Sequence, residues 1–313
     1  MAEIWENNRA YTIGRPYVDT CTRVSFRHLS LSGSLPRDCA VIIAPNHTNT
    51  LMDALVVLRT RSGPTVFGAR ADIFRRRIAR KLLTFLKILP ITRERDGLHN
   101  VIENYRSFDE IDATLDAGVP FCMFAEGRHH TDHDVLPLKK GIARIALRSA
   151  SCRHTCIVPT GINYSSFFRY RGAVEVVYGE PLDVNAFALE HSDLSGAQLH
   201  QALLDELRSR IEPLVRKEPL PNPPGWHRLL LPLWPVFALL ALPMWLTSEL
   251  VCRKVLSDKA FSNSVRMIVL TLLGPLTFVI WAIIFFSILP WWAALILLLL
   301  VIPSYPLFYD ILG

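Results

Sequence analysis

The feature that most limits the fold of this chain is a pair of long uncharged apolar runs near its C-terminus. Met267–Leu289 holds 23 residues without a charged side chain, and Trp291–Tyr309 follows directly after Pro290. A run of this length can cross a bilayer and would aggregate if it were left in water. The sequence therefore excludes a purely soluble protein, and a disordered or fibrous chain is excluded by its composition, which is half apolar.

A third apolar run, Leu229–Leu246, differs from the other two because it contains prolines and has basic residues on both sides. Arg228 precedes it, and Arg253 and Lys254 follow it. Positive charge tends to stay on the cytoplasmic side of a membrane, so this pattern favours a re-entrant pair of half-helices over a full span. The two uncharged runs, 267–289 and 291–309, are expected to form a hairpin that turns at Pro290. Three ordinary membrane spans are the alternative.

The remaining two thirds of the chain have the ordinary composition of a folded domain. We divide the chain into an N-terminal segment over 1–30, a main domain over 31–217, a proline-rich linker over 218–228 and a membrane-embedded region over 229–313. In the N-terminal segment, Tyr17–Leu29 is expected to be an amphipathic helix on a membrane or a helix that caps the domain.

Short β-rich runs alternate with helical patterns through the main domain, which predicts an α/β fold. Helices are expected to begin near Leu51, Ile73, Leu98, Gly141 and Ala197. The predicted strands are Cys39–Ala44, Thr65–Gly68, Ile88–Thr92, Val119–Ala125, Thr155–Thr160 and Ala173–Tyr178.

The strongest local motif is Asn46-His47 with Asp53 downstream, placed after a predicted buried strand and at the start of a helix. Asp53 could accept a hydrogen bond from one ring nitrogen of His47 and leave the other nitrogen free to remove a proton from a hydroxyl. No Ser or Cys nucleophile accompanies the pair in an elbow motif, so direct attack by a substrate hydroxyl is the simpler chemistry. A purely structural His–Asp pair is the alternative.

Three further blocks follow predicted strands. The first ends in Arg93, the second is Glu126-Gly127-Arg128 after Phe124-Ala125, and the third contains Val158-Pro159. Ligand sites collect at strand ends on one side of an α/β sheet, and arginines there suit a phosphate group. For Arg93 the alternative is a solvated loop charge.

These four blocks, in this order over about residues 40–180, resemble those of the glycerolipid acyltransferase superfamily. The resemblance implies a mixed sheet flanked by helices. The family usually has four residues between its His and Asp, whereas five separate His47 from Asp53, and the usual Phe-Pro-Glu-Gly-Thr-Arg becomes Phe-Ala-Glu-Gly-Arg here. Both departures look more like the branch of fungal glycerol-3-phosphate and dihydroxyacetone-phosphate acyltransferases. We expect the extra residue to be absorbed in the turn before the helix.

The resemblance implies that His47 is a general base oriented by Asp53. It also implies that Arg93 and Arg128 hold the acceptor phosphate, and that Glu126, beside Gly127, contacts a glycerol hydroxyl. The implied reaction moves a fatty acyl group from acyl-CoA or acyl carrier protein to glycerol 3-phosphate or 1-acyl-sn-glycerol 3-phosphate in phospholipid synthesis, without a metal or another cofactor. Acylation of another lysolipid or an amino-acid lipid, and a silent lipid-binding scaffold, are the alternatives.

Two charged clusters leave alternatives open. Histidines and carboxylates crowd into His129–Asp134, which suits a metal site, although we favour a polar loop at the site entrance. Arg75–Arg77, Arg80 and Lys81 on an amphipathic helix suit anionic lipid headgroups or an ordinary solvated face.

The partners expected are membrane lipids and a thioester donor, and a net charge of +6 is too diffuse to predict nucleic-acid binding. The six cysteines form no Cys-x-x-Cys pair, and because Met1–Arg15 is polar we expect no secretory leader. We therefore expect a reducing compartment, with the main domain on the cytoplasmic face of a membrane.

Overall fold

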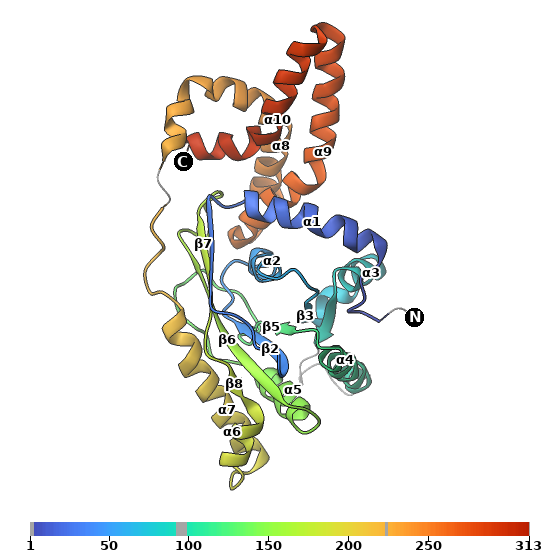
Figure 1. The fold of residues 1–313 in the computed structure, drawn as a ribbon, viewed down its shortest axis with the longest axis vertical. Coiled ribbons are helices and arrows are strands. Elements are labelled where there is room, and N and C mark those ends of the chain that lie inside the picture. Colours follow the sequence, from blue (N-terminus) through green and yellow to red (C-terminus); the bar gives the residue numbers. More distant parts are fainter. Residues whose placement is uncertain (1–2, 92–98, 223–224, 313) are drawn as a thin grey trace.

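The computed structural model describes residues 3–91, 99–222 and 225–312, which form an α/β domain joined to a bundle of apolar helices (Figure 1). The domain helices are α1 (Arg9–Val24), α2 (Leu51–Arg59), α3 (Arg77–Phe85), α4 (His99–Asp116), α5 (Lys140–Ala150), α6 (Val184–Glu190) and α7 (Gly196–Ile211). The strands are β1 (His28–Ser32), β2 (Ala40–Pro45), β3 (Val66–Arg70), β4 (Ile88–Ile91), β5 (Phe121–Met123), β6 (Thr155–Tyr164), β7 (Ala173–Tyr178) and β8 (Leu182–Asp183).

The strands form one mixed sheet in the order β1-β7-β6-β2-β5-β3-β4, with β8 paired to β6. Strands β6, β2, β5, β3 and β4 run parallel to one another, whereas β6 pairs with β7 and with β8 in the antiparallel sense. The predicted fold class, an α/β domain with a mixed sheet and a C-terminal apolar helical region, is therefore confirmed.

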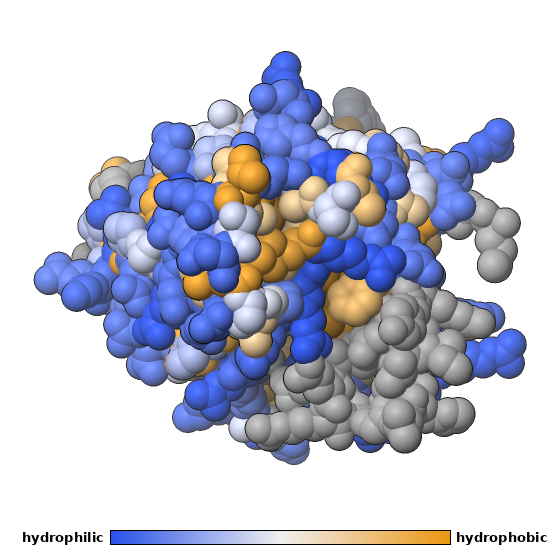
Figure 2. Space-filling view, turned by 90° about the horizontal axis from the view of Figure 1, so that it is seen from below, coloured by the Kyte–Doolittle hydropathy of each residue, from blue (hydrophilic) through white to orange (hydrophobic). Residues whose placement is uncertain are grey.

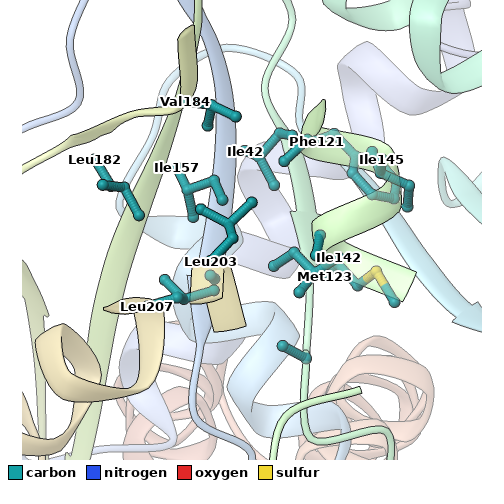
Figure 3. Packing of buried hydrophobic residues seen from close by; sticks show 14 of the residues in the cluster. Ile42, Phe121, Met123, Ile142, Ile145, Ile157, Leu182, Val184, Leu203 and Leu207 are labelled. Atoms are coloured by element: carbon teal, nitrogen blue, oxygen red, sulfur yellow. The ribbon is translucent and has the colours of Figure 1, made fainter. Parts of the chain in front are cut away.

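Both faces of the sheet are covered, as the alternation along β2 shows. Ile42 is buried with residues of α5 and α7, whereas Val41 and Ile43 face the opposite cluster with α2. Figure 3 shows the first cluster, where Ile157 of β6 packs beside Ile42 and meets Leu203 and Leu207 of α7. Burial on both faces explains why the central strands appear in the sequence as continuous apolar runs.

The N-terminal helix differs from its predicted position. The helix expected over Tyr17–Leu29 is α1, which ends at Val24, and His28–Ser32 is a strand that pairs in parallel with β7. This strand is at the edge of the sheet and is partly exposed. Only Leu29 and Leu31 are apolar here, so β1 shows a brief alternation and not the continuous apolar run of the central strands.

The apolar region begins with the 3₁₀ segment Trp226–Leu233 and continues as α8 (Trp234–Lys254), α9 (Ser262–Ile288) and α10 (Trp291–Leu312). Among the described residues, three helical stretches are long and apolar enough to cross a membrane: Leu229–Lys254, Lys259–Ile288 and Trp291–Ile311. Helices α9 and α10 form a hairpin that projects away from the sheet (Figure 1). Figure 2, viewed from the opposite end of the molecule, shows a mostly hydrophilic surface there.

Helix α8 folds back beside the base of this hairpin. Its first residue, Trp234, stacks on Phe308 near the end of α10, with ring centroids 5.9 Å apart. Near its other end, Glu249 lies 3.4 Å from Arg266 in the second turn of α9. The middle of α8 reaches further along the hairpin, since the Trp281 indole donates to the Leu240 carbonyl at 3.1 Å.

Both ends of the hairpin contact the α/β domain. At the start of α9, the Asn263 amide donates to the Phe167 carbonyl at 2.8 Å. Near the end of α10, the buried Asp310 carboxylate accepts from Arg27 at 2.6 Å and from Arg171 at 2.6 Å. The hairpin therefore leaves the domain and returns to it.

Candidate active site

The loop after β2 carries the first part of the site. The side chain of Asn46 fixes this loop to β6, because its amide donates to the Ile162 carbonyl at 3.1 Å and its oxygen accepts from the Ile162 N–H at 2.7 Å. His47 follows at the carboxyl end of β2, where loops of neighbouring parallel strands converge. The half-buried imidazole stacks on Phe124, which follows β5, with ring centroids 4.2 Å apart.

His47 and Asp53 are in direct contact, with Nδ1 of the ring 2.8 Å from Oδ2 of the carboxylate. Asp53 is fully buried and also accepts from the backbone N–H groups of Thr48 at 2.8 Å and Asn49 at 2.7 Å. The Tyr164 hydroxyl donates to its other oxygen at 2.7 Å. With Asp53 as acceptor, the proton lies on Nδ1 and Nε2 of His47 is free to act as a base.

The turn between the two residues contains a strained position. Thr50, immediately before α2, has a φ of 49°, which is unusual for a β-branched residue. Its hydroxyl lies 2.9 Å from the hydroxyl of Ser264 in α9. The spacing of five residues between His47 and Asp53 thus fits a close contact, and the same turn joins the site to the apolar helices.

Glu126 lies beneath the same loop. Its carboxylate accepts from the His47 backbone N–H at 3.0 Å and from the Leu136 N–H at 3.2 Å, and His130 Nδ1 lies 3.2 Å from it. Burial raises the pKa of Glu126 to about 7, and the charge of Asp53 adds to this rise. The hydrogen bonds from the two backbone N–H groups oppose it. Glu126 therefore positions the backbone of His47 in addition to any contact with a substrate.

The two residues after Glu126 are less buried than it is. Gly127 has a φ of 69°, and a Cβ there would come within 3.2 Å of the Lys139 side chain, so the turn favours glycine. Arg128 is exposed, and its charge lowers the pKa of Glu126. Arg93, the other predicted phosphate ligand, lies outside the described residues.

The three histidines of 129–134 point in different directions. His129 Nε2 lies 2.8 Å from Asp258 Oδ2, His130 Nε2 lies 2.9 Å from the Asp134 carbonyl, and His133 packs on Phe167. In residues 3–91, 99–222 and 225–312, no group of three His, Cys, Asp or Glu side chains could hold a metal ion. The described residues thus give the alternative of a metal site at His129–Asp134 no support.

Comparison with known proteins shows what this domain is similar to. Residues 28–163 match the profile of the family described as Acyltransferase. We call the α/β domain that contains them the acyltransferase domain, after this match. The predicted resemblance is thus confirmed for the family, while the branch with the longer His–Asp spacing stays a prediction.

Two individual proteins are similar to the acyltransferase domain. A Schizosaccharomyces pombe protein named as an uncharacterized acyltransferase is 32% identical over 80 residues, which are 25% of this chain and 12% of that protein. The crystal structure of the 1-acyl-sn-glycerophosphate acyltransferase from Thermotoga maritima matches with a TM-score of 0.44 and 19% identity, over 66% of this chain and 83% of that one.

Sequence reasoning missed three residues that shape the site. Tyr164 lies at the end of β6 and binds Asp53, but a tyrosine in a buried strand carries no distinctive signal. Ser264 and Asp258 belong to the region that we assigned to the membrane, and no contact with the site was predicted for them. Of the three, only Asp258 could have attracted attention, as one of the few charges in that region.

Proposed function

We propose that this chain is a membrane-bound O-acyltransferase of phospholipid synthesis. It would transfer a fatty acyl group from an acyl thioester to a hydroxyl of a glycerol-phosphate acceptor. The observation that carries the proposal is the contact of 2.8 Å between His47 Nδ1 and the buried Asp53, at the carboxyl ends of the strands and next to the apolar helices.

In this mechanism, Nε2 of His47 removes the proton of the acceptor hydroxyl as its oxygen attacks the thioester carbonyl. A C–O bond forms, the C–S bond breaks, and the imidazolium returns its proton to the departing thiolate. Asp53 holds the reactive tautomer and stabilises the imidazolium, as the acidic member of a catalytic triad does. Three further donors from Thr48, Asn49 and Tyr164 keep the Asp53 carboxylate oriented.

The acceptor would be glycerol 3-phosphate or its 1-acyl derivative, and the second of these would give phosphatidic acid. Arg128, which is exposed next to Glu126 in the sequence, would contact the phosphate, and Arg93 is the second candidate. Guanidinium groups suit the phosphate because they form paired, charged hydrogen bonds with it. Acyl-CoA or acyl carrier protein would supply the acyl group, and no other cofactor is required.

A single assay tests this function. Purified protein in lipid nanodiscs is given an acyl thioester, with and without each glycerol-phosphate acceptor, and the released thiol is measured. We expect acceptor-dependent thiol release that falls by about two to four orders of magnitude in His47→Ala.

His154→Ala is the matched control. His154 also pairs with an aspartate, Asp183, at 3.0 Å, but both side chains are exposed, so its loss should leave the rate unchanged. A rate in His47→Ala within a few-fold of the parent protein would refute the general base. Absence of thiol release with both acceptors would instead favour another lysolipid or a silent scaffold.

A further inference from the structure

Helix α3 presents a stripe of apolar side chains to the outside of the molecule. Ile78 is 84% exposed, Leu82 56% and Phe85 40%, and Leu86 continues the row. These positions recur at intervals of three and four residues, so they share one helix face. Every residue of this helix is exposed or half-buried, so α3 lies on the domain without contributing a side chain to its core.

Basic residues flank this apolar stripe. Arg75 and Arg76 precede the helix, Arg77 begins it, and Lys81 lies one turn further along beside Leu82. All four are exposed. An apolar face bordered by cations is the composition of helices that lie in the interface of an anionic bilayer.

The position of α3 agrees with such a role, because α1 joins it to the membrane helices. The Tyr17 hydroxyl of α1 donates to the Thr271 carbonyl of α9 at 2.9 Å, four residues into the uncharged run that starts at Met267. Further along α1, Tyr11 meets Phe85 of α3 edge to face, with ring centroids 6.2 Å apart. Helix α1 lies crosswise to α9 (Figure 1), so α3 sits near the depth at which the hairpin enters the apolar phase.

We infer that α3 is an interfacial helix that inserts Ile78, Leu82 and Phe85 into the headgroup region of an anionic bilayer. Arg75, Arg76 and Lys81 bind the lipid phosphates. Together with the α9–α10 hairpin, this second contact fixes the tilt of the acyltransferase domain on the membrane. The inference concerns binding to the lipid surface and does not depend on the proposed reaction.

Hydrogen exchange of the full chain in nanodiscs tests the inference. Amides of residues 77–86 are followed in phosphatidylcholine alone and in phosphatidylcholine mixed with phosphatidylglycerol. We expect exchange to be slower in the anionic discs, by roughly tenfold, since several cations near such a surface act together. Arg75→Gln/Arg76→Gln/Lys81→Gln should remove this difference, and Ile78→Asp/Leu82→Asp should restore fast exchange in both discs.

The matched control is Leu189→Asp, because Leu189 is 78% exposed and its helix, α6, lies at the end of the domain away from the hairpin (Figure 1). This variant should leave exchange in 77–86 unchanged, and exchange in β2 and β6 checks that every variant is folded. Equal exchange at 77–86 in the two kinds of disc would overturn the inference. Slower exchange at 77–86 that appears only when a second protein is added would also overturn the inference, because the apolar stripe would then bind a protein and not the lipid.

Discussion

His129 and Asp258 are hydrogen-bonded across the boundary between the acyltransferase domain and the apolar helices, with Nε2 and Oδ2 2.8 Å apart. The bond lowers the pKa of Asp258. The same imidazole contacts the ring of His47 edge to face, with centroids 5.8 Å apart. The segment between α8 and α9 therefore contacts a direct neighbour of the candidate general base.

We predict that this pair acts as a unit. His129→Ala and Asp258→Ala should each lower the rate of acyl transfer by roughly twofold to fivefold, the effect of a partly exposed pair. The double variant should be no slower than either single one, because both changes break the same contact. Asp132→Ala, an exposed change in the same loop, is the control. Additive losses would show that the two side chains act separately.

A second prediction concerns the pH dependence of stability. The pKa of Glu126 is raised to about 7 in the folded protein, mainly by burial, with Asp53 raising it and Arg128 lowering it. Between an ordinary glutamate pKa of roughly 4.3 and about 7, the folded state holds a proton that the unfolded state releases. This contribution to stability is therefore present at low pH and is lost as pH rises through that window.

Glu126→Gln should remove this dependence. The free energy of unfolding of the parent and of the variant is measured from pH 4 to pH 8. The difference between the two should change by a few kcal/mol as pH rises through the window. Parallel curves would mean that burial does not raise the pKa of Glu126 as described.

The main features of the fold follow from periodicity. Strand β7 begins and ends at the predicted residues, and α2 begins at Leu51 as expected. Strand β5 is shorter than predicted because the chain leaves the sheet after Met123. Edge strand β1 was missed because it is short and lacks a continuous apolar run. The position of α8 depends in part on the contact of Trp234 with Phe308, which lies far along the chain in α10.

The site was predictable where its chemistry is encoded within one motif. The contact between His47 and Asp53 was predicted from their spacing in the sequence. The position of Glu126 was predicted because it follows a strand whose carboxyl end lies beside that of β2. Tyr164 was not predictable because it reaches Asp53 only through the pairing of β6 with β2. Asp310 was also missed, since a lone carboxylate near the end of an apolar run gives no indication of its arginine partners.

A third prediction follows from that carboxylate. Asp310 is fully buried and neutralises two arginines, Arg27 and Arg171, whose side chains are largely buried as well. Asp310→Asn would leave both cations without their charge partner, which should cost about 3–5 kcal/mol of unfolding free energy. Glu212→Gln, which breaks the exposed pair with Arg208, should change stability by less than about 0.5 kcal/mol. Thermal unfolding in nanodiscs distinguishes the two, and equal shifts would contradict the role of Asp310.

The last prediction is the membrane topology. Because Asn263 and Asp310 both dock on the acyltransferase domain, we expect the two ends of the hairpin to lie on one side of the membrane. Helix α8 should also be re-entrant, since Trp234 and Glu249 lie beside the base of the hairpin. An impermeant maleimide should therefore label Ser257→Cys and Gly313→Cys from the cytoplasmic side of sealed vesicles, in a background without the six native cysteines, which also serves as the blank. Labelling of Ser257→Cys only from the opposite side would favour three full spans. A spanning α8 would place its C-terminal end, with Arg253 and Lys254, on the far side of the membrane.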